Sequence, residues 1–510
     1  MAISQKRRIW GWMFFDWAQQ PFYTLGLTFV FGPYFAYVAT ELFVSQGEAL
    51  SEAKAHSQWL WSLGQTISGV IIALSAPLLG AIADRSGRKI PWIIFFSVAY
   101  VVASALLWGL TPDGANLILM LVIFYVGFIA AESGLNFVNA YLPSMGTDEE
   151  IGRVSGSGSA FGYWGGVVSL FIMLLLLAEN ESGVTLLGTA PLFGLDPDLR
   201  EGTRSVGPFI AIWYLVFMVP FFLWVRDVPK PKGSAVAREG ILRELVTTIR
   251  AIFRRKSLGS FLLGSMLYRD ALNALYAFGG VYAALVLDWS IIQIGVFGIV
   301  AAIAAAIVTW AGGLTDQRIG PKPVIQGAVW ALIVVCIIIV GMSRESLLGI
   351  PLAEGSAIPD IIFYICGAVI GGAGGSLYAA SRTLMVRHTD PARPTEAFGL
   401  FALTGKATAF LAPGLITIFT AATGSNQKGF IPVIILFILG LWILRWVNPN
   451  GEKGSWAEAE YDKNHPPDHQ ICALRRPALC RAIRRGGGSP PSEPVSLADR
   501  QPRVRRVLGA

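Results

Sequence analysis

Long apolar segments follow one another along most of the chain, and the short links between them carry most of the charged residues. Twelve segments are long enough to cross a bilayer, since a helix needs about 20 apolar residues to span the hydrocarbon layer. The predicted spans are residues 12–40, 59–83, 90–111, 115–140, 154–178, 205–225, 259–286, 290–313, 323–343, 358–381, 397–421 and 428–446. The pattern therefore predicts an all-α polytopic membrane protein with twelve transmembrane helices.

Composition supports this prediction and narrows the class of partner. The chain is 54% hydrophobic and 14% charged, whereas soluble globular proteins have about 25% charged residues. A net charge of +7 would suggest nucleic-acid binding in a soluble protein. Here most basic residues lie between spans or in the C-terminal segment, where membrane topology and anionic lipids account for them. We therefore expect the lipid bilayer as a partner, and no nucleic acid.

The basic residues are distributed unevenly over the links, which predicts the orientation in the membrane. If the N-terminus is cytoplasmic, the inward links hold many basic residues, among them Arg85, Arg88, Lys89, Arg153, Arg318, Lys322, Arg387 and Arg393. The outward links hold only Lys54, Arg200, Arg204, Arg344 and Lys428. Short basic links stay in the cytoplasm. We therefore expect a multi-pass protein of a bacterial inner (plasma) membrane with both termini cytoplasmic.

An internal repeat indicates that the spans form two halves. The sequence Gly80-x-x-x-Asp84 after the second span is echoed by Gly312-x-x-x-Asp316 after the eighth. Six-span repeats predict two pseudo-symmetric six-helix bundles with a substrate site between them. The expected parts are bundles at 1–225 and 259–449, a cytoplasmic linker at 226–258, and a disordered basic cytoplasmic tail at 450–510.

The link after the second span combines charge and glycine in a short segment. Residues 80–90 read Gly-Ala-Ile-Ala-Asp-Arg-Ser-Gly-Arg-Lys-Ile. We expect Asp84 and Arg85 to form a charge network at the ends of neighbouring helices, which would hold the cytoplasmic side closed. The predicted gating residues are Gly80, Asp84, Arg85, Gly87, Arg88 and, in the second half, Asp316.

A few polar and ionisable side chains interrupt the predicted spans. Each ionisable group at membrane depth costs about 2.5–3.5 kcal/mol on insertion, so these groups are functional candidates. The candidates for substrate binding or coupling are Asp16, Gln19, Glu132, Asn136, Asn139, Asp270, Asn273, Arg382 and Lys406. A carboxylate could bind a substrate ammonium or carry a proton, and a cationic side chain could bind a substrate carboxylate.

The same groups could instead form internal salt bridges that hold helices together. Both interpretations stay open for Asp270, Glu132 and Lys406, while a structural or gating role is favoured for Arg382 and Asp16 near the cytoplasmic rim.

Asp270 is the first candidate for proton coupling, because it lies near the middle of the hydrocarbon layer. A close pairing with Lys406 would make Asp270 a structural strut instead. Arg269 precedes Asp270 directly, so the two side chains point to different faces of a helix and should have different partners.

Sequence motifs of enzymes and metal sites are missing from the spans. The histidines His56, His388, His465 and His469 all fall outside the predicted spans, so no intramembrane histidine metal site is expected. No Ser/His/Asp arrangement is available within the membrane. We therefore expect neither a cofactor nor an enzymatic activity.

Several motifs together carry a family resemblance. The link at 80–90 resembles the signature loop of the major facilitator superfamily (MFS) of secondary transporters. Residues 11–18, 139–143 and 398–408 resemble the "unknown major facilitator" group, which includes the fungal autophagy-related vacuole effluxer. Tyr-Arg-Asp-Ala at 268–271 departs from the Tyr-Asn-Asp-Gly that is usual in this group.

The resemblance implies alternating access for a small polar solute, with amino-acid efflux first among the activities. Protons are a candidate coupling ion, and we expect a monomer. The alternative is a membrane receptor or sensor that has the same fold but is inactive in transport.

Overall fold

The structure is a computed structural model. It describes residues 3–180, 182–227, 255–289, 291–353, 355–391, 393–408, 411–425 and 427–452. These residues belong to one compact unit, Met1–Lys453. Most of the predicted linker (228–254) and the predicted tail from residue 453 onward lie outside the described residues.

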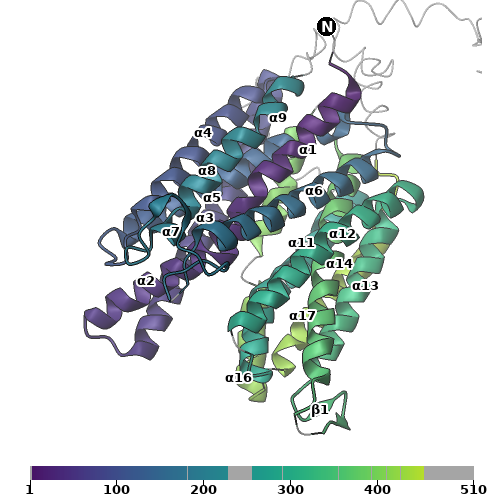
Figure 1. Ribbon diagram of the computed structural model, residues 1–510. Helices are drawn as coiled ribbons and strands as arrows, with labels where there is room; N and C mark the ends of the chain where they lie inside the picture. Colours follow the sequence, from purple (N-terminus) through teal and green to yellow (C-terminus); the bar gives the residue numbers. More distant parts are fainter. Residues whose placement is uncertain are drawn as a thin grey trace, which may run out of the picture. The chain divides into compact units, whose positions relative to one another are not determined.

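The N-terminal half forms one helical bundle (Figure 1). Its helices are α1 (Gln5–Pro21), η1 (Phe22–Phe29), α2 (Phe31–Ser45), α3 (Leu50–Ser86), α4 (Ile90–Leu106), η2 (Leu107–Gly109), α5 (Leu117–Asn139), η3 (Leu142–Ser144), α6 (Ile151–Ile172), η4 (Met173–Leu177), η5 (Leu192–Gly194), α7 (Glu201–Arg204), α8 (Val206–Phe217) and α9 (Val219–Trp224).

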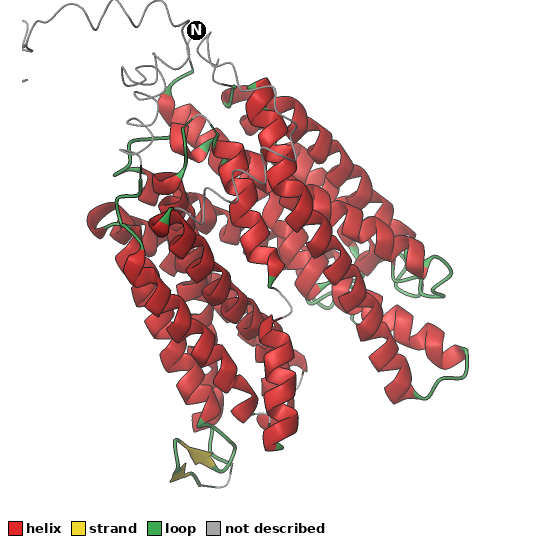
Figure 2. Ribbon diagram, turned by 180° about the vertical axis from the view of Figure 1, so that it is seen from behind, coloured by secondary structure: helices red, strands yellow, loops and turns green. Residues whose placement is uncertain are grey.

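The C-terminal half forms the second bundle. Its elements are α11 (Lys256–Val286), α12 (Ile291–Ile319), α13 (Pro321–Val340), β1 (Ser346–Leu347), β2 (Ile350–Pro351), α14 (Ile358–His388), α15 (Pro394–Ala407), α16 (Leu411–Thr423), η6 (Lys428–Phe430), α17 (Ile431–Ile443) and η7 (Leu444–Trp446). The two short strands pair antiparallel in the loop between α13 and α14, and the other regular elements of the described residues are helices joined by loops (Figure 2).

The helices agree with the predicted spans. Eleven helical segments of the described residues are long and apolar enough to cross a membrane. The predicted seventh span corresponds to α11, whose apolar sequence is interrupted by Arg269 and Asp270. The all-α polytopic fold with two six-helix bundles is therefore confirmed.

Several helices extend beyond the predicted spans and so change the setting of candidate residues. Helix α3 continues to Ser86, so Asp84 and Arg85 lie in its last turn and not in a loop. Gly87 ends the helix with φ +65°, and its N–H donates to the Ala83 carbonyl (3.0 Å). This left-handed conformation is strained for residues with a Cβ atom, which explains the glycine.

Two predicted spans are not continuous α-helices. The first changes at Phe22 from α1 into the π-helix η1, directly after Pro21, and α2 begins at Phe31. The eleventh is divided into α15 and α16, and residues 409–410 between them are outside the described part. Interrupted spans are tolerated where neighbouring protein satisfies the freed backbone groups.

Glycines at four-residue spacing allow two pairs of helices to approach closely. In α6, a Cβ atom on Gly158 would lie 2.6 Å from the Trp12 ring, and one on Gly162 would lie 3.1 Å from the Asp16 backbone oxygen. Gly371 of α14 meets the backbone of Ala301 in α12 in the same way. The glycine spacing therefore serves packing, as expected for small residues between transmembrane helices.

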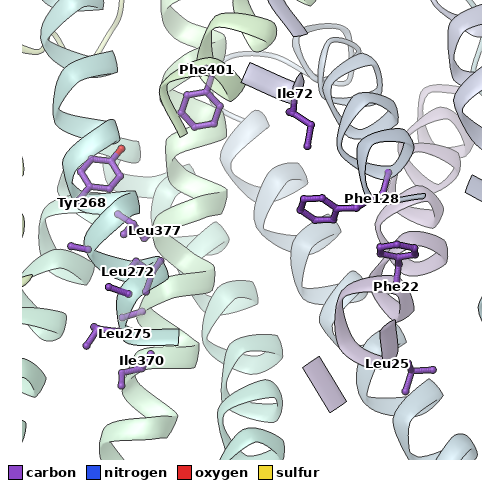
Figure 3. Close-up of a cluster of buried hydrophobic side chains, with 14 of the residues drawn as sticks. Phe22, Leu25, Ile72, Phe128, Tyr268, Leu272, Leu275, Ile370, Leu377 and Phe401 are labelled. Carbon is purple, nitrogen blue, oxygen red and sulfur yellow. The ribbon is translucent and has the colours of Figure 1, made fainter. Parts of the chain in front are cut away.

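Buried apolar side chains pack inside both bundles. Phe22 and Leu25 are fully buried in the N-terminal bundle, as are Leu272 and Leu377 in the C-terminal bundle (Figure 3).

Candidate functional site

The two bundles touch closely at two helix crossings near the C-terminal end of α3 and the N-terminal end of α6. A Cβ atom on Gly156 of α6 would clash with the Gly313 Cα atom of α12. A Cβ atom on Gly80 of α3 would lie 2.5 Å from the Thr395 carbonyl oxygen at the start of α15. We call this region, defined by Gly80, Gly156, Gly313 and Thr395, the closed end.

The repeated aspartates lie against helix N-termini at this closed end. Asp84 is 5% exposed, and its Oδ2 accepts a hydrogen bond from the Glu396 backbone N–H in α15 (2.8 Å). Asp316 of α12 is 1% exposed and faces the start of α6, where a Cβ atom on Gly152 would lie 2.6 Å from its Cγ. A carboxylate is favourable at a helix N-terminus, which carries partial positive charge. Both repeats thus place a carboxyl group against the opposite bundle.

The other predicted gating residues of this segment lie at the C-terminal end of α3 or directly after it. Arg85 is half-buried and Arg88 is exposed. One contact of Asp84 is the hydrogen bond from a backbone N–H group of the opposite bundle, and the predicted charge network with Arg85 stays a prediction.

We expect Asp84→Asn to reduce substrate flux about fivefold while the protein still folds. The amide can accept the Glu396 N–H but has no charge, and a charge at a helix N-terminus is worth about 1 kcal/mol. Flux into proteoliposomes measures the effect, with Glu52→Gln, which neutralises an exposed carboxylate of α3, as the control. Wild-type flux in Asp84→Asn would contradict a gating role.

Arg382 of α14 joins the C-terminal bundle to three helices of the N-terminal bundle. Its Nη1 lies 3.4 Å from Asp16 Oδ2 on α1 and donates to Asn139 Oδ1 on α5 (3.2 Å). Its Nη2 donates to the Ser155 carbonyl (2.9 Å) and the Ser159 hydroxyl of α6, and its Nε to Ser155 Oγ (3.3 Å). We call these five residues the Arg382 cluster.

A second interbundle ion pair joins Glu132 of α5 to Lys406 of α15. Lys406 Nζ lies 3.4 Å from Glu132 Oε1 and 5.1 Å from the Phe128 ring centre. Glu132 also accepts a hydrogen bond from the Tyr23 hydroxyl (3.1 Å). The Lys406 and Glu132 side chains are 24% and 15% exposed, so the pair is more accessible than the Arg382 cluster.

One face of α5 thus contacts both Lys406 and Arg382 of the opposite bundle. Glu132 contacts Lys406, and Asn139, seven residues later, contacts Arg382. Seven residues correspond to about 10 Å along a helix, so the two contacts lie at different depths. Asn136 lies between them and is 8% exposed.

Gln19 and Asn273 have partners within their own bundles. Gln19 Nε2 donates to the Ala131 carbonyl (2.8 Å) and the Tyr23 hydroxyl (3.1 Å). Asn273 Oδ1 accepts from the Tyr378 hydroxyl (3.1 Å). Gln19 therefore supports Tyr23, which in turn contacts Glu132.

Arg269 and Asp270 hold the two parts of the divided eleventh span. Arg269 Nη1 donates to the Phe401 carbonyl in α15 (2.8 Å), and its guanidinium lies 4.2 Å from the Phe401 ring centre. Asp270 Oδ2 accepts the Ala412 N–H at the start of α16 (3.0 Å). The two neighbours do have different partners, and Lys406, the partner considered for Asp270, is paired with Glu132.

Ser155, Ser159 and Tyr23 were not among the predicted site residues. Ser155 and Ser159 are four residues apart in the run Ser-Gly-Ser-Gly-Ser and share a helix face. That spacing, next to close-packing glycines, is the signal in the sequence that could have identified them. Tyr23 has no comparable signal.

A family model described as "Vacuole effluxer Atg22 like" matches residues 4–455, which include all twelve predicted spans. The chain belongs to this Atg22-like family. A relative called "Uncharacterized MFS-type transporter YxiO", from Bacillus subtilis, is 25% identical over 444 residues, which cover 86% of this chain and 94% of that protein. "Autophagy-related protein 22-1" of Sclerotinia sclerotiorum is 23% identical over 315 residues, which cover 57% of this chain and half of the fungal protein.

Solved structures of MFS transporters share the fold of this Atg22-like chain. FucP in the outward conformation aligns with a TM-score of 0.61 at 13% identity, over 86% of this chain and 98% of FucP. A bacterial homologue of the iron transporter ferroportin, in an outward-facing state, aligns with a TM-score of 0.59 at 16% identity, over 87% and 98%. The chain is an integral multi-pass MFS-type transporter and not an enzyme.

Proposed function

We propose that this Atg22-like transporter moves small zwitterionic solutes, neutral amino acids first, by alternating access between its two bundles. The observation that carries the proposal is the Glu132–Lys406 pair, in which an anion and a cation from opposite bundles lie 3.4 Å apart. The direction proposed is efflux, with protons as the coupling ion and a monomer as the working unit.

The pair has the charges that a zwitterion needs. A substrate ammonium would replace Lys406 beside Glu132 and the Tyr23 hydroxyl, and the substrate carboxylate would bind Lys406. Both protein charges are partly exposed, so a solute can reach them without unfolding a core. When an amino acid separates Glu132 from Lys406, its ammonium and carboxylate groups pair with both protein charges. A solute without charges would leave both Glu132 and Lys406 unpaired.

The proposed orientation follows the basic links. The closed end carries the N-terminus and Arg88, and short basic links stay in the cytoplasm. The closed end is then the cytoplasmic end in a bacterial inner (plasma) membrane, and the described conformation is outward-facing.

We expect Glu132→Gln and Lys406→Met each to raise the KM for transported amino acids about tenfold or more. A hydrogen bond to a charged group contributes about 1.5–3 kcal/mol, and each variant removes one such bond to the substrate. Uptake and counterflow in proteoliposomes over an amino-acid panel, with and without a pH gradient, measure the effect.

The double variant Glu132→Gln with Lys406→Met separates binding from a structural role. If the pair only stabilises the fold, the double variant should regain the thermal stability and the transport that the single variants lose. If the pair binds substrate, transport stays lost in the double variant. Ligand binding without any flux in the wild-type protein would instead favour a receptor or sensor.

A further inference from the structure

The Arg382 cluster contains a second carboxylate whose charge state controls an interbundle contact. We infer that Asp16 is a proton-binding site and that its protonation releases Arg382, which allows the closed end to open. This inference rests on the proton coupling in the proposed function and assigns it to a residue other than Asp270.

Geometry makes Arg382 dependent on Asp16. The guanidinium is 7% exposed and carries a permanent charge, since arginine stays protonated in proteins. Asn139, Ser155 and Ser159 contribute neutral oxygen acceptors, so within the cluster Asp16 supplies the negative charge. The acceptors all belong to the N-terminal bundle, so separation of the bundles breaks every bond of the cluster.

The surroundings of Asp16 contain few other ionisable groups. Within the described residues, helices α8 and α9, which pack against α1, have no Asp, Glu, Lys, Arg or His. On α5 the carboxylate is Glu132, which is paired with Lys406. Near Asp16 lie the phenols of Tyr23 on η1 and Tyr163 on α6, which are neutral at physiological pH. Arg382 is thus the cation in contact with Asp16.

The proton balance of the step is simple. One proton binds the Asp16 carboxylate and gives a neutral carboxylic acid, while Arg382 keeps its charge. A buried cation without an anion is unfavourable, so Arg382 gains by moving into water as the bundles separate. The contact between Asp16 and Arg382 is present at pH values above the pKa of Asp16, and it is lost as the pH falls through that pKa. Release of the proton restores the carboxylate and the contact.

Asp270 is less suited to this role. Its Oδ2 binds the N-terminal turn of α16 within its own bundle, so separation of the bundles does not expose or release it. Asp16 also lies at a contact between the bundles, which Asp270 does not.

The test measures opening directly, without any substrate. Spin labels on Glu149→Cys and Arg318→Cys, exposed positions of opposite bundles near the closed end, report their separation in nanodiscs. Cys472 and Cys480 are replaced by serine, and Asp84 and Asp316, the other carboxyl groups that lie between the bundles at the closed end, are replaced by asparagine so that they do not titrate. In the otherwise wild-type protein, we expect the ratio of open to closed molecules to rise up to tenfold per pH unit as the pH falls, as for one bound proton. Asp16→Asn, which mimics the protonated acid, should be open to the same extent at every pH.

Matched variants distinguish titration from damage to the fold. Asn139→Ala removes a neutral partner of the same guanidinium, so it should favour opening but keep the pH dependence. Asp16→Glu should also keep it. A pH dependence that persists in Asp16→Asn, or is missing in the folded wild-type protein, would overturn the inference. Because no solute is present, a failure to transport amino acids would refute the proposed substrate and leave this result standing.

Discussion

Gly156→Leu is expected to abolish transport while the protein still folds and inserts. A Cβ atom at this position would already clash with the Gly313 Cα atom, and backbone atoms of a packed helix cannot move aside locally. The bundles would therefore have to stay apart at the closed end. A transporter that cannot close one end cannot alternate, so we expect at least a twentyfold loss of flux, about 2 kcal/mol in the population of the closed state.

Flux in proteoliposomes and the Glu149–Arg318 spin-label distance measure this effect together. Gly327→Leu is the matched control, because Gly327 is exposed on α13 and a Cβ atom there would meet nothing within 4 Å. The control should transport normally. Normal flux in Gly156→Leu would show that the crossing of α6 and α12 adapts to a side chain.

Asp270→Ala is expected to destabilise the protein more than the loss of any single interbundle contact. The variant leaves the N–H of Ala412 at the start of α16 without its acceptor, in a span that is already divided. Loss of a hydrogen bond to a buried charged group costs about 1.5–3 kcal/mol, so the thermal midpoint should fall by several degrees. Thermal unfolding of the purified protein measures the change.

The control for this variant is Asn273→Ala, one turn further along α11, which removes a neutral hydrogen bond to Tyr378. It should shift the midpoint less. Adding Lys406→Met to Asp270→Ala should not restore stability, because Lys406 is paired with Glu132. A stable Asp270→Ala protein that exchanges substrate but has lost accumulation driven by a pH gradient would instead support proton coupling at Asp270.

The sequence predicted the spans well because hydrophobic length is a local property. It also identified the repeated Gly80 and Asp84 pattern, since that motif is continuous in the chain. The end of α3 was placed too early, because charge was interpreted as the start of a loop, whereas Gly87 ends the helix three residues after Asp84.

The partners of the candidate charges were less predictable. Depth in the membrane follows from position along a span, so Asp270 and Lys406 were reasonable partners by depth. Which face of a helix meets which neighbour depends on tertiary packing. In the folded chain Lys406 pairs with Glu132, and Asp270 accepts a hydrogen bond from the Ala412 N–H. The division of the eleventh span had one signal, Pro413, because proline is common in the first turn of a helix.

The composition of the closed end has a consequence for how fast it can separate. Its crossings bring glycine against backbone, as at Gly156 and Gly313, and the neighbouring Arg382 cluster adds a set of hydrogen bonds between the bundles. Glycines at a helix crossing expose little apolar area when the helices separate. Exposure of apolar area to water costs about 25 cal/mol of free energy per square ångström. Water that enters can replace the hydrogen bonds one by one, so no single large barrier has to be crossed. Larger apolar residues at these crossings would increase the free-energy cost of separating the bundles and would slow transport.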